Sequence, residues 1–306
     1  GDVMIIVAEI GASHHGSLDR AIATVHAAAE AGADAIKLQT WAEDTMDCGG
    51  RVLDSGPWKG HSLRDLYRKA HTPWAWHQPL ATAAQTLGME WWSTPFDTPS
   101  YAFLETIGCP RYKIASFELV DIPLIRAVST AGKPIILSTG MASLEEIAAA
   151  VAAAGDCPLT LLRCVSSYPA NPSEFNLASI RDLAERYAWR GVEVGLSDHT
   201  KTPTVASAAA LLGATMIERH LTLTCDQSVD DVFASLPFEF KYMVESVRTT
   251  LEAFGEPTYG PTPSESPSVA LRRSLWVVED IKAGGVLTWS NLKTARPAEG
   301  LAPVHL

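Results

Sequence analysis

The sequence predicts an α/β fold, specifically a (β/α)8 TIM barrel, because short strand-like runs alternate with alanine-rich helical stretches. A doubly wound open sheet is the alternative, and the count of eight runs favours the closed barrel. The eight runs are Val3–Ile10, Asp34–Gln39, Met89–Ser93, Tyr112–Ala115, Pro134–Ser138, Leu159–Cys164, Val192–Leu196 and Thr215–Arg219.

The stretches between these runs carry helix start and stop signals. Leu18–Ala31, Leu144–Ala154 and Thr204–Leu212 have apolar residues at helical spacing. Ser143 precedes two glutamates and is expected to be an N-cap. Glycines stand where the helices should end: Gly32, Gly88, Gly108, Gly132 and Gly213.

The alternating pattern ends at Phe254, so residues 1–254 are expected to form the barrel domain. Residues 255–268, GEPTYGPTPSESPS, are rich in Pro, Ser and Gly and are typical of a linker. Residues 269–306 show short strands and turns, and this segment is too short for a robust core of its own. We expect an incomplete second domain that something else supports.

Composition limits the classes of function. The net charge of −11 argues against a nucleic-acid partner or an anionic membrane surface, whereas a local cationic site for a small anion is compatible with it. The five cysteines lack CxxC spacing and are typical of reduced thiols in a cytoplasmic protein. The start, GDVMIIVAEIG, does not resemble a signal peptide, and no stretch approaches the roughly 20 apolar residues of a membrane helix.

Polar side chains occur at the end of every predicted strand. In a TIM barrel the C-terminal ends of the strands surround the active site, so polar groups at all eight ends predict a ring-shaped site. The residues are Glu9, Lys37, Gln39, Ser93, Thr94, Lys113, Ser116, Ser138, Thr139, Ser166, Ser167, Tyr168, Ser197, His199, Glu218 and His220.

Two lysines, Lys37 and Lys113, end otherwise apolar strands, where an unpaired ammonium group is costly to bury. Each could pair with a neighbouring acid, and a Schiff-base lysine is a further alternative. Two lysines beside several hydroxyls favour a cradle for phosphate plus carboxylate. The hydroxyls belong to Thr94, Ser116, Ser138, Ser166 and Ser197.

Two histidines, His199 and His220, end strands seven and eight, which are neighbours in a barrel. Two neutral imidazoles with oxygen ligands suit a divalent ion such as Mn²⁺ or Zn²⁺, and a hydrogen-bonded structural role is the alternative. His14 and His15, after strand one, are further candidates or members of a polar loop. Residues 49–74 form a long insertion after strand two, which is typical of a loop that shapes substrate binding.

Eight ordered motifs resemble the N-acetylneuraminate (sialic acid) synthase family over nearly the whole chain: AEIGASHHGSLDRA, AGADAIKLQT, STPFD, YKIASFEL, GKPIILSTGMASLEEI, CVSSYPA, GLSDHT and IERHLTL. The resemblance implies an enzyme that condenses phosphoenolpyruvate with an amino-sugar aldehyde and releases phosphate. DTM, GPWKGHSLRDLYRKAHTPWAWH and KIASFELVDIPLI are most similar to the branch that makes pseudaminic acid from 2,4-diacetamido-2,4,6-trideoxy-L-altrose. N-acetylneuraminate and legionaminic acid synthesis are the alternatives within the family.

The resemblance also implies roles for individual residues. His199 and His220 match metal-binding positions, usually for Mn²⁺, with Mg²⁺ or Co²⁺ as alternatives. Glu9 and Gln39 match residues that face the acceptor sugar, and Glu9 is a candidate general acid or base. Phosphoenolpyruvate would be held by Lys37, Thr94, Lys113, Ser116, Ser138 and Ser197, with Ser166 and Tyr168 nearby.

An acidic residue of the family falls in SVDDVFAS. Counting back from Phe240 selects Asp230, which is expected to be catalytic, and counting on from His220 makes Asp231 the alternative. At residues 13–16 this chain has Ser-His-His-Gly where the family usually has Asn-His-Asn-Gly, which affects the contacts expected near the sugar.

The C-terminal segment resembles part of the antifreeze-like (SAF) domain, which caps the partner's barrel in a domain-swapped homodimer. Arg296 in KTARPAEG matches an arginine that reaches the partner's sugar site. We therefore expect an incomplete capping domain that acts across the dimer.

Two other functions are weighed against a synthase. A metal-dependent sugar aldolase or isomerase would share the barrel and the histidines but would not need a phosphate cradle. A non-catalytic carbohydrate-binding protein would not need an acid, metal ligands and an anion cradle together.

Overall fold

The computed structural model describes residues 4–42, 45–46, 49–56, 58–225 and 229–305 of the chain. Two compact units are present, Gly1–Phe254 and Gly255–Leu306, and each is described by itself. No described helix has both the length and the apolar character needed to cross a membrane.

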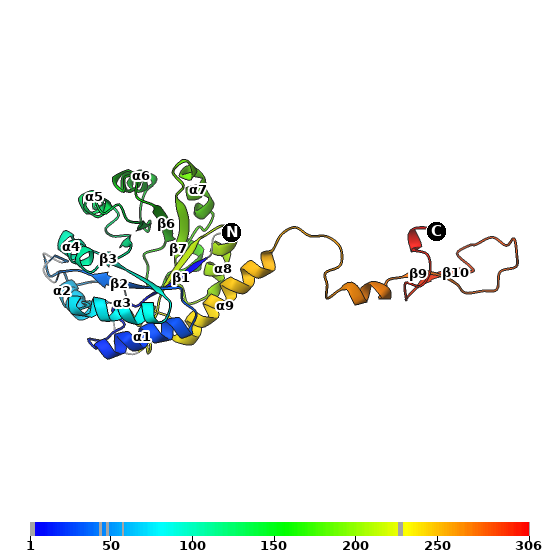
Figure 1. The fold of residues 1–306 in the computed structure, drawn as a ribbon, viewed down its shortest axis with the longest axis horizontal. Coiled ribbons are helices and arrows are strands. Elements are labelled where there is room, and N and C mark those ends of the chain that lie inside the picture. The colour runs from blue at the N-terminus through cyan, green and yellow to red at the C-terminus, as the bar shows by residue number, and fades with distance from the viewer. Residues whose placement is uncertain (1–3, 43–44, 47–48, 57, 226–228, 306) are drawn as a thin grey trace. The chain divides into compact units, whose positions relative to one another are not determined.

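The first unit confirms the predicted barrel, with eight parallel strands that close in chain order (Figure 1). Each predicted run lies within two residues of an observed strand at both ends. The strands are β1 (Ile5–Glu9), β2 (Ala35–Thr40), β3 (Glu90–Pro95), β4 (Tyr112–Ile114), β5 (Ile135–Ser138), β6 (Leu159–Cys164), β7 (Glu193–Ser197) and β8 (Met216–His220).

Helices connect the strands, and the three helices predicted above begin and end within one residue of the observed bounds. Ser143 forms the expected N-cap and is part of a capping box with Glu146. The helices are α1 (Leu18–Glu30), α2 (Leu63–Ala70), α3 (His77–Thr86), α4 (Thr98–Thr106), α5 (Ile122–Ser129), α6 (Leu144–Ala153), α7 (Ser179–Arg186), α8 (Pro203–Leu211) and α9 (Pro237–Phe254).

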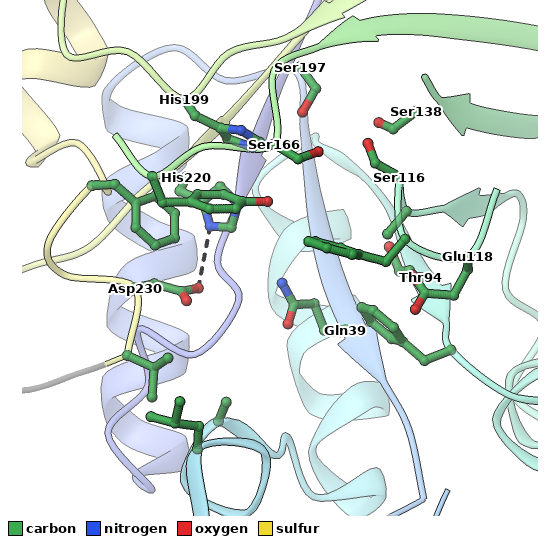
Figure 2. Close-up of a pocket in the computed structure, with 18 of the residues that line it drawn as sticks. Gln39, Thr94, Ser116, Glu118, Ser138, Ser166, Ser197, His199, His220 and Asp230 are labelled. Atoms are coloured by element: carbon green, nitrogen blue, oxygen red, sulfur yellow. Dashed lines mark ion pairs between the residues drawn. The ribbon is translucent and has the colours of Figure 1, made fainter. Parts of the chain in front are cut away.

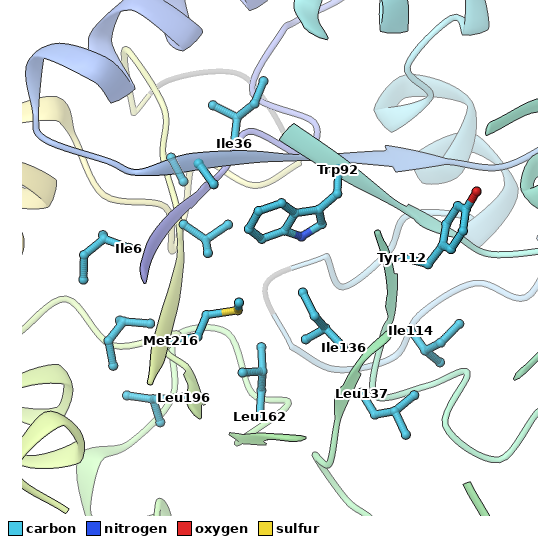
Figure 3. Close-up of a cluster of buried hydrophobic side chains, with 14 of the residues drawn as sticks. Ile6, Ile36, Trp92, Tyr112, Ile114, Ile136, Leu137, Leu162, Leu196 and Met216 are labelled. Carbon is cyan, nitrogen blue, oxygen red and sulfur yellow. The ribbon is translucent and has the colours of Figure 1, made fainter. Parts of the chain in front are cut away.

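An apolar layer closes the barrel beneath the ends of the strands. Side chains two residues apart on a strand share a face, so the residue two positions before each cavity residue points to the same side. For the cavity residues Thr94, Ser138, Cys164 and Glu218, those preceding positions hold large buried side chains (Figure 3). These are Trp92, Ile136, Leu162 and Met216. Inward-facing positions of the same strands therefore carry apolar side chains inside the barrel and polar side chains at its C-terminal end.

The second unit contains one two-stranded antiparallel sheet, β9 (Ser274–Val277) paired with β10 (Leu292–Ala295). Large apolar side chains such as Val277 and Trp289 are exposed on this unit. Its assignment as a partial antifreeze-like (SAF) domain stays a prediction.

Candidate active site

A cavity of about 830 Å³ lies at the C-terminal ends of strands β2 to β8. Its size is in the range usual for small-molecule sites. Figure 2 shows the polar side chains that enter it from different strands. The following residues predicted from the sequence line it: Lys37, Gln39, Thr94, Lys113, Ser116, Ser138, Ser166, Tyr168, Ser197, His199, His220 and Asp230.

The two lysines share one buried carboxylate. Glu218 Oε1 lies 3.5 Å from Lys37 Nζ and 3.3 Å from Lys113 Nζ, and Lys37 also forms an ion pair with Glu9. Burial by itself lowers the pKa of Lys37, but Glu218 and Glu9 outweigh it and hold that pKa above its usual value. For Lys113 burial prevails, and its pKa is lowered. Both lysines are thus paired with acids, which was one of the alternatives left open by the sequence, and both line the cavity; their role in binding an anion stays a prediction.

Four serine hydroxyls, from Ser116, Ser138, Ser166 and Ser197, gather on one side of the cavity (Figure 2). Gly140 makes room for them, because a Cβ atom there would lie 2.2 Å from Ser166 Oγ and 2.7 Å from Ser116 Oγ. The Gly140 amide donates a hydrogen bond to Ser116 Oγ. Ser138 Oγ is buried and has no hydrogen-bond partner among the described residues. This hydroxyl is available to a ligand.

The two histidines lie side by side, with ring centroids 5.5 Å apart. His199 Nδ1 donates to the carbonyl of Val165 at 2.9 Å, which leaves the Nε2 lone pair free for a ligand. His220 Nδ1 is buried and lies 3.3 Å from Asp230 Oδ2, as the dashed line in Figure 2 shows. In the described part of the chain, no three His, Cys, Asp or Glu side chains form a group that could hold a metal ion.

Asp230 and Asp231 point in different directions. Asp230 lines the cavity, and its Oδ2 accepts a hydrogen bond from the amide of Ala12 at 3.0 Å. Asp231 instead contacts His15 Nε2 at 3.0 Å and Thr222 Oγ1 at 2.7 Å. Asp230 is therefore the aspartate placed beside His220.

A buried ion pair fixes the strand ends that carry the histidines. Asp198 and Arg219 pair with each other and are almost fully buried. Arg219 also donates to the carbonyl of Thr202 at 2.6 Å. Ser197 and His199 line the cavity. Asp198 stands between them in the chain and points away from the cavity, because successive side chains of an extended chain alternate in direction. The polar residues that follow β7 thus serve both the cavity and the scaffold behind it.

Two predicted site residues and one histidine pair are not in the lining. Glu9 is fully buried, and its Oε1 accepts a hydrogen bond from the Gly11 amide at 2.5 Å while Oε2 pairs with Lys37. Arg296 follows β10 in the second unit. His14 Nε2 contacts the carbonyl of Ala70, the last residue of α2, at 3.2 Å, and His15 contacts Asp231, so both histidines hold neighbouring segments together.

Sequence reasoning missed titratable residues in the lining, among them Glu118 and Cys164. Burial raises the pKa of Glu118 to about 7, and its Oε2 has no hydrogen-bond partner among the described residues. Burial also raises the pKa of the Cys164 thiol, but His199 and other neighbours bring it down to about 7. Cys164 could have been found by scoring the last inward-facing position of each strand, whereas Glu118 lies in a loop that alternation does not describe.

The barrel and this cavity define a class of protein: a TIM-barrel protein whose cavity, at the C-terminal ends of the strands, is lined by buried charged and polar side chains. The family model described as the NeuB family matches residues 24–259, and the chain belongs to this family.

Similar proteins include pseudaminic acid synthase of Helicobacter pylori, which is 39% identical over 97% of this chain and 89% of that protein. N,N'-diacetyllegionaminic acid synthase of Campylobacter jejuni is 33% identical over 98% of this chain and 92% of that protein. The crystal structure of N-acetylneuraminic acid synthetase from Leptospira borgpetersenii, in complex with citrate, is 31% identical with a TM-score of 0.75. The alignment covers 88% of this chain and 90% of the Leptospira chain.

Proposed function

We propose that this protein condenses phosphoenolpyruvate with an open-chain amino sugar to give a nonulosonic acid and phosphate. The proposed acceptor is 2,4-diacetamido-2,4,6-trideoxy-L-altrose, and the proposed product is pseudaminic acid. The observation that carries the proposal is the grouping, in one cavity, of two buried lysines, four serine hydroxyls and a pair of histidines. The resemblance to pseudaminic acid synthases supports the choice of acceptor.

Phosphoenolpyruvate is placed over the lysines. Lys37 and Lys113 supply positive charge, and Thr94 and the serine hydroxyls supply hydrogen bonds to phosphate and carboxylate oxygens. Ser138, whose hydroxyl has no partner among the described residues, gains one when the anion binds. Such a cradle holds the nucleophile in a fixed orientation and stabilises the departing phosphate. Tyr168 closes this region from the β6 side.

Beside the cradle, two imidazoles and a carboxylate are of the donor type that would hold a divalent cation, proposed to be Mn²⁺ with Mg²⁺ or Co²⁺ as alternatives, although in the described part of the chain they are not gathered into a preformed group of three ligands. The Nε2 lone pair of His199 is directed away from its hydrogen bond to Val165, and the buried Nδ1 of His220 lies 3.3 Å from Asp230 Oδ2, so that two imidazoles and one carboxylate oxygen are close together. Imidazole and carboxylate are suitable donors for such ions. When bound, the ion would polarise the carbonyl group of the acceptor as a Lewis acid.

The reaction joins carbon 3 of phosphoenolpyruvate to the carbonyl carbon of the sugar. Carbon 2 becomes cationic, and water adds there and loses one proton, while the sugar oxygen gains a proton. The tetrahedral intermediate then breaks its bond from carbon 2 to the phosphate oxygen, and its hydroxyl proton passes to the departing phosphate, which leaves a ketone at carbon 2. Glu118 is the proposed proton carrier, because its pKa of about 7 suits exchange near neutral pH. Glu9, the residue that the sequence suggested for this role, is instead proposed to orient Lys37. Gln39 is proposed to contact the sugar.

The C-terminal unit is proposed to cap the barrel of a partner subunit in a domain-swapped dimer, with Arg296 entering the partner's sugar site. Arg296→Ala subunits mixed with His199→Ala subunits test this, since each is expected to be nearly inactive alone. If the cap acts in trans, about a quarter of the sites in a random mixture combine an intact barrel with an intact arginine and recover activity. No recovery, once subunit exchange has been shown independently, would contradict the domain-swapped arrangement.

The proposed location is the cytoplasm, in agreement with four free cysteines among the described residues.

The test of the function is phosphate release measured with phosphoenolpyruvate and a panel of amino-sugar aldehydes. Release that requires both substrates is expected, with a nonulosonic acid formed in equal amount. Sugar cleavage or isomerisation without phosphoenolpyruvate would instead indicate an aldolase or isomerase.

A further inference from the structure

The cavity has two chemically different sides. The lysines and hydroxyls come from strands of the barrel and the loops that follow them, whereas the described residues between β2 and α3 that line the cavity contribute a predominantly apolar surface. We call this surface the apolar wall and define it by six cavity-lining residues: Trp41, Met46, Leu53, Trp58, Leu63 and Leu66.

The apolar wall is held in place by specific contacts. Trp41 is buried, packs edge-to-face on Phe96 with ring centroids 5.4 Å apart, and accepts a hydrogen bond at its carbonyl from Trp74 Nε1 at 3.0 Å. Trp58 Nε1 donates to the carbonyl of Val229 at 2.9 Å, across the cavity mouth in the loop after β8. The wall is thus anchored at both ends and forms a built surface of the site.

Phosphoenolpyruvate has no surface that matches this wall, because it consists of a carboxylate, a phosphate and a two-carbon vinyl group. The apolar wall must therefore face the other substrate. Among the described residues that line the cavity, the lysines and arginines are Lys37 and Lys113, which lie on strands β2 and β4. An acceptor with a phosphate at its far end would place that dianion against apolar side chains without a cation, which is strongly unfavourable.

We infer that the apolar wall selects acceptors by their methyl groups, namely the methyl at carbon 6 of a 6-deoxy sugar and that of a second acetamido group. This inference rests on the proposed function and adds the residues that determine which sugar is used. One methyl group in an apolar pocket changes kcat/KM by roughly 10- to 200-fold. A sugar with hydroxyl groups at these positions would leave them without hydrogen-bond partners against the wall.

The experiment compares the trideoxy diacetamido acceptor with N-acetylmannosamine in the phosphate-release assay. The wild-type enzyme is expected to prefer the trideoxy sugar by about tenfold or more in kcat/KM. Met46→Gln and Leu53→Asn keep the size of the side chain and make it polar. Each is expected to reduce this preference by about tenfold, mainly through KM for the sugar, while KM for phosphoenolpyruvate is unchanged.

Val52→Thr is the matched control, because Val52 adjoins Leu53, is 58% exposed and does not line the cavity. It is expected to keep the wild-type preference. Circular dichroism verifies that each variant is folded, and the comparison of sugars in the wild type needs no variant.

The outcomes separate the two proposals. Phosphate release with neither sugar, nor with any other aldehyde of the panel, would contradict the proposed function itself. Equal use of both sugars by the wild type would overturn the inference and leave the synthase function intact. The inference would also be overturned by folded Met46→Gln and Leu53→Asn variants that retain the wild-type preference, or that weaken phosphoenolpyruvate and sugar equally.

Discussion

Replacing Lys37 by methionine is predicted to destabilise the barrel much more than the same change at Lys113. Lys37 pairs with the fully buried Glu9 and lies 3.5 Å from Glu218. Lys113 contacts Glu218 alone among the described acids. Lys113→Met leaves Glu218 with Lys37, whereas Lys37→Met leaves the Glu9 carboxylate buried without a cation.

The magnitude follows from this asymmetry. Removing one partner of a buried ion pair costs about 3–5 kcal/mol, because the remaining charge is uncompensated. In a domain of this size each kcal/mol lowers Tm by about 2–4 °C, so Lys37→Met is expected to lower Tm by about 6–20 °C. Loss of the single contact at Lys113 is expected to cost about 1–3 kcal/mol.

The assay is thermal unfolding followed by circular dichroism, supported by urea titration where unfolding is reversible. Glu9→Gln combined with Lys37→Met removes the unpaired carboxylate of Glu9 and is expected to recover a large part of the lost stability. Equal destabilisation by the two lysine variants, or no recovery in the double variant, would refute the reasoning that Lys37 is held by Glu9.

Three further predictions concern the site. His199→Ala and His220→Ala should each leave a folded protein but abolish Mn²⁺ binding, measured by calorimetry, and turnover with it. Unchanged metal content together with near wild-type activity would rule out the two-histidine site. Burial raises the pKa of Glu118 from 4.5 to about 7, so its ionisation should cost the folded protein up to about 3 kcal/mol as pH rises through that range and none below it. Glu118→Gln removes this cost, and parallel stability–pH curves for wild type and variant would contradict it. Arg219→Met should weaken Mn²⁺ binding about 10- to 100-fold, because the arginine supports the strand end that carries His199. Arg219→Lys should retain part of the Mn²⁺ affinity. Wild-type affinity in the methionine variant would show that this support is dispensable.

The barrel was predictable because its signals are local. Runs of apolar residues define the strands, and Ser143 with Glu146 defines the start of α6. The cavity residues at strand ends, such as Lys113 and Ser197, were predictable for the same reason, since the fold brings all C-terminal strand ends to one rim. Motif resemblance added the family and the metal-binding role expected of His199 and His220.

Other features were not predictable from local patterns. Asp230 and Asp231 are adjacent in the chain, and only contacts with Ala12 and His15, more than 200 positions away, decide which one faces the cavity. The burial that raises the pKa of Glu118 likewise depends on neighbours brought together by folding.

The sequence by itself determined the order of strands and helices, the ring of polar strand ends and the family, because periodicity and motifs are carried by neighbouring residues. Only the tertiary structure decided that Glu9 holds Lys37 from outside the cavity lining, and that Glu218 joins the two lysines. It alone also showed that Trp58 fastens the apolar wall to the loop after β8. These features depend on distances between side chains far apart in the chain, and such distances are set when the strands close into the barrel.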